Sequence, residues 1–114
     1  AEGDIRGIET RFAPANLPAN LALVTLLGDW AARKSATRGQ VALAWLMAQK
    51  PWIVPIPGST QMAHMLENTG AAAISFTPPE LDELTAAVRA IDIQGQRLPD
   101  AVLAYSNVEA PSRN

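Results

Sequence analysis

The chain has 114 residues, a formal net charge of −2 and no cysteine. The weakly acidic balance argues against a nucleic acid as a partner, and the lack of cysteine excludes disulfides and thiolate metal sites. No apolar run is long enough to cross a bilayer and no signal peptide opens the chain, so we expect a cytoplasmic protein with no metal and no membrane partner.

Residues 1–20 are predicted to be a loop because glycines and prolines interrupt them and no helical or strand period is sustained. These interrupting residues are Gly3, Gly7, Pro14 and Pro18. Arg6 and Arg11 in this loop either reach an anionic ligand or are solvated loop charges.

From about Pro18 to Lys34 apolar residues recur at helical spacing, which predicts a helix. These residues are Leu23, Val24, Leu27 and Ala31. Arg33 and Lys34 fall in the last turn, where cations suit the helix dipole. We interpret Trp30 as a core or interface aromatic residue.

A second helix is predicted to start after Thr37, because Gln40 three residues later completes a capping-box signature. Its apolar stripe consists of Val41, Ala44, Trp45 and Ala48. Much of its remaining surface is also apolar, through Ala42, Leu43 and Leu46. We therefore expect this helix to be buried on two sides and to end at Pro51.

The next stretch, from Trp52 to Val54, is short, apolar and partly β-branched, which predicts a buried strand. Pro55 and Pro57 each lack a backbone donor, so the strand is not expected to continue through them. Gly58 then allows a sharp turn and a close approach of the backbone to another group.

A helix from about Gln61 to Gly70 follows this turn, with Ser59 or Thr60 as its predicted cap. Its apolar positions, spaced by three and four, are Met62, Met65 and Leu66. The turn and the helix N-terminus together offer free N–H groups, two hydroxyls and a positive dipole end, which suit an anion. The alternative is a strand-to-helix turn that binds nothing.

The last helix is predicted to start at a second capping box, Thr77 to Glu80, and to run to about Ile91. Its apolar face consists of Leu81, Leu84, Val88 and Ile91. From Asp92 onward we expect an extended, loosely attached tail, with a possible turn near residues 100–105.

We therefore expect one region over 1–114, with a loop at 1–20, helices plus one strand at 21–92, and an extended tail at 93–114. Four helices accompany a single strand, and a lone strand cannot satisfy its backbone donors and acceptors. The strand either pairs with a copy of itself in a second chain or is remodelled.

Four ordered motifs resemble the aldo-keto reductases, the NADP-dependent (β/α)8-barrel carbonyl reductases. PIPGST at 55–60 with Glu67-Asn68 resembles the family's last strand, loop and helix, and the likeness extends upstream through QVALAWLMAQKPWIV from Gln40. DIR at 4–6 with Arg11-Phe12 resembles the D-x-R…R-F segment of a bacterial branch of the family. QGQRLP at 94–99 resembles the family's C-terminal Q-G-x-R-Y-P stretch, with Leu98 where Tyr is common.

The resemblance implies a fold that is α/β by ancestry and mostly helical in this piece. Since such a barrel needs about 250 residues, at most its C-terminal third to two-fifths, with the last strand, is present. The resemblance also implies that NADP is the cofactor and that this piece carries the adenosine half of its site. The residues implied to bind it are Gly58, Ser59, Thr60, His64, Glu67 and Asn68.

Two of these positions depart from the family pattern. Gly58 stands where many members have Lys, and His64 where many have an Arg that grips the 2′-phosphate and stacks on adenine. Arg is permanently charged, whereas an imidazole is mostly neutral at pH 7, which weakens the preference for NADP over NAD. His64 can equally be a partly exposed helix residue, and Glu67 a solvated carboxylate.

The family's catalytic Asp, Tyr, Lys and His come from early strands, and none of those motifs occurs here. The only tyrosine, Tyr105, is interpreted as a packing residue, so no catalytic residue is assigned and the chain alone is predicted to be inactive. The sequence thus favours the C-terminal part of a reductase, and the alternative is a self-associating helical module that binds no dinucleotide. The partner is either a second copy, most simply in a two-fold dimer, or the missing N-terminal part of the barrel.

Overall fold

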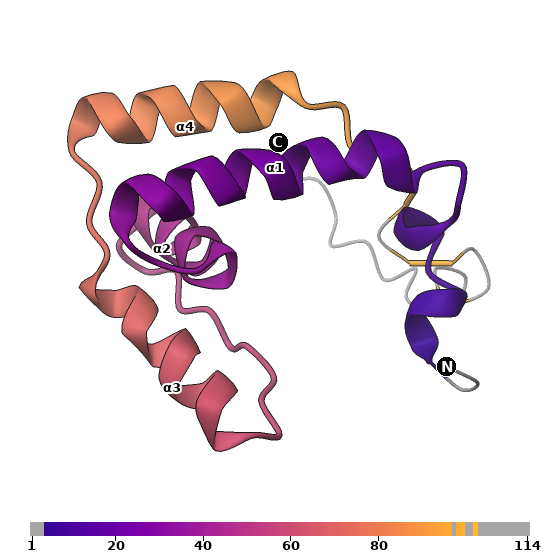
Figure 1. Ribbon diagram of the computed structural model, residues 1–114, viewed down its shortest axis with the longest axis horizontal. Coiled ribbons are helices and arrows are strands. Elements are labelled where there is room, and N and C mark those ends of the chain that lie inside the picture. Colours follow the sequence, from indigo (N-terminus) through magenta and orange to yellow (C-terminus); the bar gives the residue numbers. More distant parts are fainter. Residues whose placement is uncertain (1–3, 97, 100–101, 103–114) are drawn as a thin grey trace, which may run out of the picture. The chain divides into compact units, whose positions relative to one another are not determined.

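The computed structural model describes residues 4–96, 98, 99 and 102. In order, its elements are the 3-10 turns η1 (Ile5–Gly7) and η2 (Thr10–Phe12), the helices α1 (Leu17–Lys34), α2 (Arg38–Gln49) and α3 (Met62–Gly70), the turn η3 (Ala71–Ala73) and the helix α4 (Pro78–Ala90) (Figure 1). This part of the chain is mostly helical, as predicted. It divides into two compact units, one of residues 22–91 and one of the described residues before Ala22 and after Ile91.

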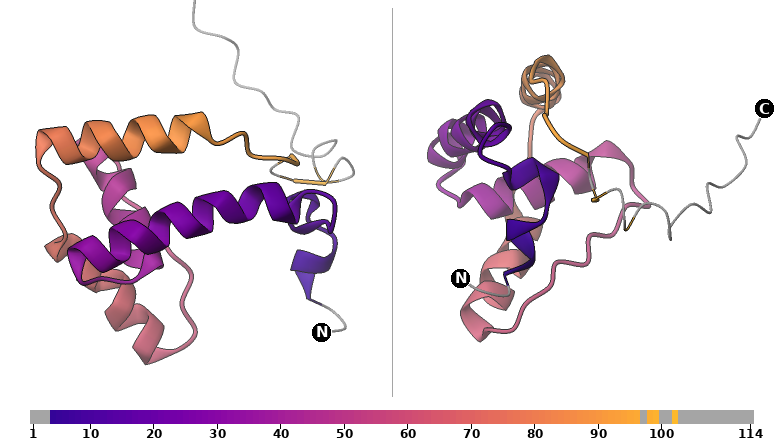
Figure 2. Two further views of the ribbon diagram at one scale, coloured as in Figure 1. Left: turned by 45° about the horizontal axis from the view of Figure 1, so that its top comes forward. Right: turned by 90° about the vertical axis from the view of Figure 1, so that its right-hand side faces the viewer.

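The core of the 22–91 unit lies where α1, α2 and α4 meet. Leu84 of α4 and Val41 of α2 are fully buried, and Trp30 of α1 is only 2% exposed. Trp30 also packs edge to face against Phe76, with the ring centroids 5.9 Å apart. Figures 1 and 2 show α4 running antiparallel beside α1. The interpretation of Trp30 as a core aromatic residue is confirmed.

Both predicted capping boxes are present. Thr37 Oγ accepts a hydrogen bond from the Gln40 N–H at 3.2 Å, and Gln40 Oε1 accepts from the Thr37 N–H at 3.1 Å. Thr77 and Glu80 form the equivalent pair of bonds at the start of α4. Each box satisfies two of the N–H groups that a helix start leaves free, which explains why these two helix starts were predictable.

The last turn of α1 is joined to the first turns of α4 by opposite charges. Lys34 Nζ lies 2.7 Å from a Glu80 carboxylate oxygen, and Arg33 forms two hydrogen bonds with Glu83. Hydrogen bonds from the Lys34 ammonium and the Thr77 N–H lower the pKa of Glu80 to about 2. The Arg33 guanidinium also lies 3.7 Å from the centre of the Trp30 ring, so it covers the core aromatic residue while it pairs with α4.

The predicted strand at Trp52–Val54 is wrong: Trp52 lies in a turn and residues 53–59 have no regular structure. A strand needs a neighbouring backbone, and among the described residues no strand is present to supply one. The segment nevertheless keeps a period of two, because Trp52, Val54 and Ile56 are 75%, 80% and 93% exposed whereas Ile53 and Pro55 are partly covered. Within the single chain the segment is remodelled, and its pairing with a second copy stays a prediction.

Burial of α2 on two sides is also not observed within the described residues. Val41 and Ala44 are buried, whereas Leu46 is 41% exposed and Ala48 is exposed as well. On the second apolar face of α2, Ala42 and Leu43 are half-buried and Leu46 is exposed, so this face is only partly covered.

In the other unit, residues 94–96 are held against residues 10–20 and are not loosely attached. The Asn20 amide donates to the Gln94 and Arg11 carbonyls at 2.8 and 2.9 Å and accepts from the Gln94 N–H at 2.7 Å. Gly95 has φ +88°, and a Cβ there would lie 2.8 Å from the Thr10 backbone. Within the predicted loop at 1–20, the described residues form two 3-10 turns and the start of α1. The turn expected near residues 100–105 falls outside the described residues except for Val102, and so does Tyr105.

Candidate functional site

The candidate site starts at the loop before α3. Gln61, not Ser59 or Thr60, is the N-cap of α3, and no side chain accepts a hydrogen bond at this cap. The predicted cap is therefore wrong. The first amides of α3 accordingly receive no cap from a side chain, which is the arrangement that favours an anion at a helix N-terminus.

The Ser59 hydroxyl is engaged further along α3. It accepts a hydrogen bond from the Asn68 amide at 2.8 Å, which ties the loop to the second half of the helix. Because the oxygen of Ser59 accepts this bond, its own hydrogen is free to be donated elsewhere, including to a phosphate oxygen. Two residues that the sequence assigned to one site are thus in direct contact.

The other residues assigned to the site are open to solvent. Gly58, Thr60 and His64 are exposed, and a Cβ at Gly58 would meet no atom within 4 Å. The close approach that a glycine permits at this position is therefore not made within the described residues.

Glu67 is half-buried, and its carboxylate is hydrogen-bonded at the surface. Its Oε1 accepts a hydrogen bond from the Thr37 hydroxyl at 2.6 Å, and its carbonyl accepts from the Gln40 amide at 2.8 Å. The capping box of α2 is therefore bonded to the middle of α3. The sequence analysis identified Thr37 and Gln40 only as a cap, although the unused NH2 group of Gln40 was a signal that it had a further partner.

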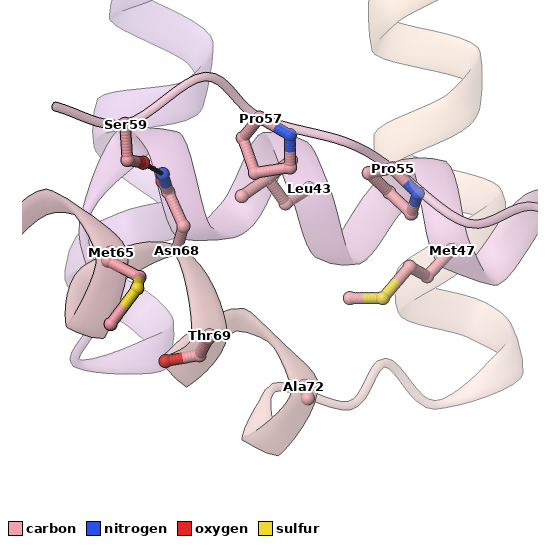
Figure 3. A pocket seen from close by; sticks show the side chains of 9 residues that line it. All are labelled: Leu43, Met47, Pro55, Pro57, Ser59, Met65, Asn68, Thr69 and Ala72. Atoms are coloured by element: carbon pink, nitrogen blue, oxygen red, sulfur yellow. Dashed lines mark hydrogen bonds between the residues drawn. The ribbon is translucent and has the colours of Figure 1, made fainter.

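A cavity of about 570 Å³ lies beside the same loop, between α2, α3 and the extended segment (Figure 3). Its lining residues, none of them charged, are Leu43, Met47, Pro55, Pro57, Ser59, Met65, Asn68, Thr69 and Ala72. Figure 3 shows the Ser59–Asn68 hydrogen bond at one end of the cavity and Met47 toward the other. The cavity is mainly apolar, and hydrogen-bonding groups reach it near Ser59 and Asn68.

Both arginines of the N-terminal loop make contacts within their own unit. Arg6 is paired with Asp4 at 2.6 Å, and this bond lowers the pKa of Asp4 to about 2. Arg11 donates a long hydrogen bond of 3.5 Å to the Gly95 carbonyl. The structure therefore favours the interpretation of Arg6 as a loop charge engaged with its own neighbour.

Comparison with known proteins identifies the family. The model of the Aldo/keto reductase family matches residues 3–89, which is most of the chain. The chain belongs to this family. A curated relative, aldo-keto reductase yakc (NADP+) of Schizosaccharomyces pombe, is 36% identical over 98 residues. The match covers 86% of this chain but only 29% of that protein, and no solved structure matches.

Family membership confirms the resemblance drawn from the motifs at 40–54, 55–60 and 67–68. Membership of this family implies descent from a (β/α)8 barrel. The described residues contain helices and no strand. None of the described helices is both long and apolar enough to cross a membrane.

Proposed function

We propose that this chain is the C-terminal, cofactor-binding portion of an NADP-dependent aldo-keto reductase, a (β/α)8-barrel enzyme that reduces aldehydes or ketones when complete. The observation that carries the proposal is the loop at 58–60, which the Ser59–Asn68 hydrogen bond closes onto α3 next to Glu67. The Schizosaccharomyces pombe relative carries NADP(+) in its name, which supports the choice of cofactor.

The residues fit the adenosine end of such a cofactor. The first amides of α3 and the free hydrogen of the Ser59 hydroxyl suit the 2′-phosphate, because both are donors beside the positive end of a helix. Gly58 leaves the backbone open to approach. Glu67 and Asn68 stand where the family meets the adenine and ribose. When bound, the cofactor supplies hydride.

His64 supplies the only titratable cation among the six assigned residues. It is exposed on α3, one turn before Glu67. An imidazole ring at this place can donate a hydrogen bond to a phosphate oxygen, so His64 is proposed to contribute to phosphate binding. Since exposed ion pairs contribute about 0.2–1 kcal/mol, we expect His64 to add no more than about fivefold to the affinity.

The test is a titration of 2′-phospho-AMP against the wild type and His64→Ala at pH 5.5 and pH 8. We expect the wild type to bind more tightly than the variant. Taking the ratio at each pH removes the titration of the phosphate itself, whose second pKa is about 6. Equal affinities of the two proteins at both pH values would take His64 out of the site, and no binding at all would contradict the proposal.

Catalysis is a separate part of the proposal. The chain has one histidine and one tyrosine, and none of the family's catalytic motifs from the early strands, so we propose that it does not reduce carbonyls alone. The measurement is NADPH oxidation with 4-nitrobenzaldehyde. Turnover above the buffer rate that survives repurification would show that this chain carries a catalytic set of its own.

We propose that the chain binds a protein partner, because the segment after α2 exposes an apolar face formed by Trp52, Val54 and Ile56. This contiguous apolar face needs a cover. We propose that the rest of the barrel covers it in a complete reductase and that a second copy covers it, in a two-fold dimer, when the chain is alone. Light scattering at micromolar concentration should give the dimer mass for the wild type and a lower mass for Trp52→Ser. A wild-type monomer would contradict the dimer.

A further inference from the structure

Four hydrogen bonds organise the start of α2, and two of them join it to the middle of α3. Two are the capping box itself, between Thr37 and Gln40. The other two leave the box: the Thr37 hydroxyl donates to Glu67 Oε1 at 2.6 Å, and the Gln40 amide donates to the Glu67 carbonyl at 2.8 Å. Both ends of the Gln40 amide are therefore used, and Glu67 is held at its side chain and at its backbone.

The Gln40 amide lies in the space that a side chain at position 70 would occupy. The φ and ψ of Gly70 are −60° and −20°, an ordinary helical conformation that any residue adopts. A Cβ at this position, however, would lie 2.6 Å from the Gln40 Nε2 atom, far closer than a real contact. The backbone does not require glycine here, but a side chain at this position would displace the Gln40 amide.

The Thr37 hydroxyl donates to one oxygen of the Glu67 carboxylate. The second carboxylate oxygen of Glu67 accepts no hydrogen bond from the described residues. A carboxylate at neutral pH only accepts hydrogen bonds, so the group it can select on a nucleotide base is a donor. On adenine the exocyclic amino group is the donor, and hypoxanthine carries an oxygen in its place.

We propose that Thr37, Gln40 and Gly70 are positioning residues of the nucleotide site. They orient Glu67 so that its second carboxylate oxygen meets the amino group of adenine, and they thereby set the preference for an adenine nucleotide. This inference rests on the proposed function, because it assigns Glu67 to the adenosine end of the cofactor.

The test compares binding of NADP+ with binding of its deamino analogue, in which hypoxanthine replaces adenine. The purified protein should prefer NADP+ by about tenfold, the value of one charge-assisted hydrogen bond. Gln40→Glu keeps the acceptor that caps Thr37 but removes the donor to Glu67. Gly70→Ala pushes the Gln40 amide away while it improves helix propensity. In both variants the preference should fall below about threefold.

The matched control is Thr77→Val, which breaks the equivalent capping box of α4 and leaves the bonds of Glu67 in place. Thr37→Val is expected to lose both stability and the tenfold preference for NADP+. Thr77→Val is expected to lose a similar amount of stability and to keep the tenfold preference. A merely structural role would change stability and leave the ratio of the two affinities unmoved.

Each outcome decides something. An unchanged ratio in Gln40→Glu and Gly70→Ala, or a wild type that binds both ligands equally, overturns the positioning role and leaves the proposed function standing. A wild type that binds neither ligand contradicts the proposed function, and the inference falls with it.

Discussion

Replacing Leu84 by Ala tests whether the junction of α1, α2 and α4 is the core of the 22–91 unit. Leu84 is 0% exposed and packs in one cluster with Trp30 and Val41, which are 2% and 0% exposed. Removal of three carbons loses about 2.4 kcal/mol of transfer free energy, at about 0.8 kcal/mol each. The neighbours belong to three different helices and cannot close the gap easily, so a residual cavity adds about 1 kcal/mol.

We therefore expect Leu84→Ala to lower the free energy of unfolding by about 3–4 kcal/mol. With a slope of about 1–2 kcal/mol per molar urea, the unfolding midpoint should fall by about 2 M. Circular dichroism at 222 nm and tryptophan fluorescence measure it. The control is Leu66→Ala on α3, where the side chain is 62% exposed and the cost should stay below about 1 kcal/mol. If both substitutions cost the same, the cluster is not the core.

Two further predictions concern acid stability and the C-terminal segment. Because the folded pKa of Glu80 is lowered to about 2, its contribution to stability is complete above its ordinary value of 4.5 and is lost as the pH falls toward 2. The urea midpoint should therefore drop less between pH 5 and pH 2.5 in Glu80→Gln than in the wild type, and equal drops would contradict this. Gly95→Ala forces a Cβ to 2.8 Å from the Thr10 backbone at a φ of +88°, so the Gln94 amide, bonded to Asn20, should exchange its hydrogen at least tenfold faster. Unchanged exchange would show that residues 94–96 are not held by this contact.

The helix starts were predictable because the information that specifies them is local. A Thr followed three residues later by Gln or Glu satisfies N–H groups within one turn, whatever surrounds it. The capping boxes at Thr37 and Thr77 therefore form as expected. Pro51 likewise ends α2 within two residues, at Gln49.

The strand failed because its stability depends on backbone groups outside itself. Trp52–Val54 has the composition of a barrel strand, and the segment keeps the alternating exposure of one. Without a neighbour in the described residues its N–H and C=O groups have no ladder to join. Composition predicted a buried strand, but it could not supply the pairing or the cover that a buried strand needs.

The site was only half predictable for a related reason. Motif positions grouped Ser59 with Asn68, and the structure bonds them. The contact of Glu67 with Thr37 in the α2 cap joins residues 30 apart in sequence. A pattern of neighbouring residues cannot predict a contact over that separation. A capping residue with unused donors, such as Gln40, is the one feature that pointed beyond its own helix.

These contacts divide the candidate site into two parts with different requirements. Glu67 and Asn68 lie on α3, which is bonded to α2 within the 22–91 unit, so their placement does not depend on a strand. Gly58 and Thr60 belong to the loop that follows the extended segment, and they are exposed. A paired strand would fix the start of this loop, as neighbours in a barrel do. We therefore expect the adenine end of the site to be preorganised in the chain alone, and the phosphate end to gain most of its affinity when a partner strand orders the loop.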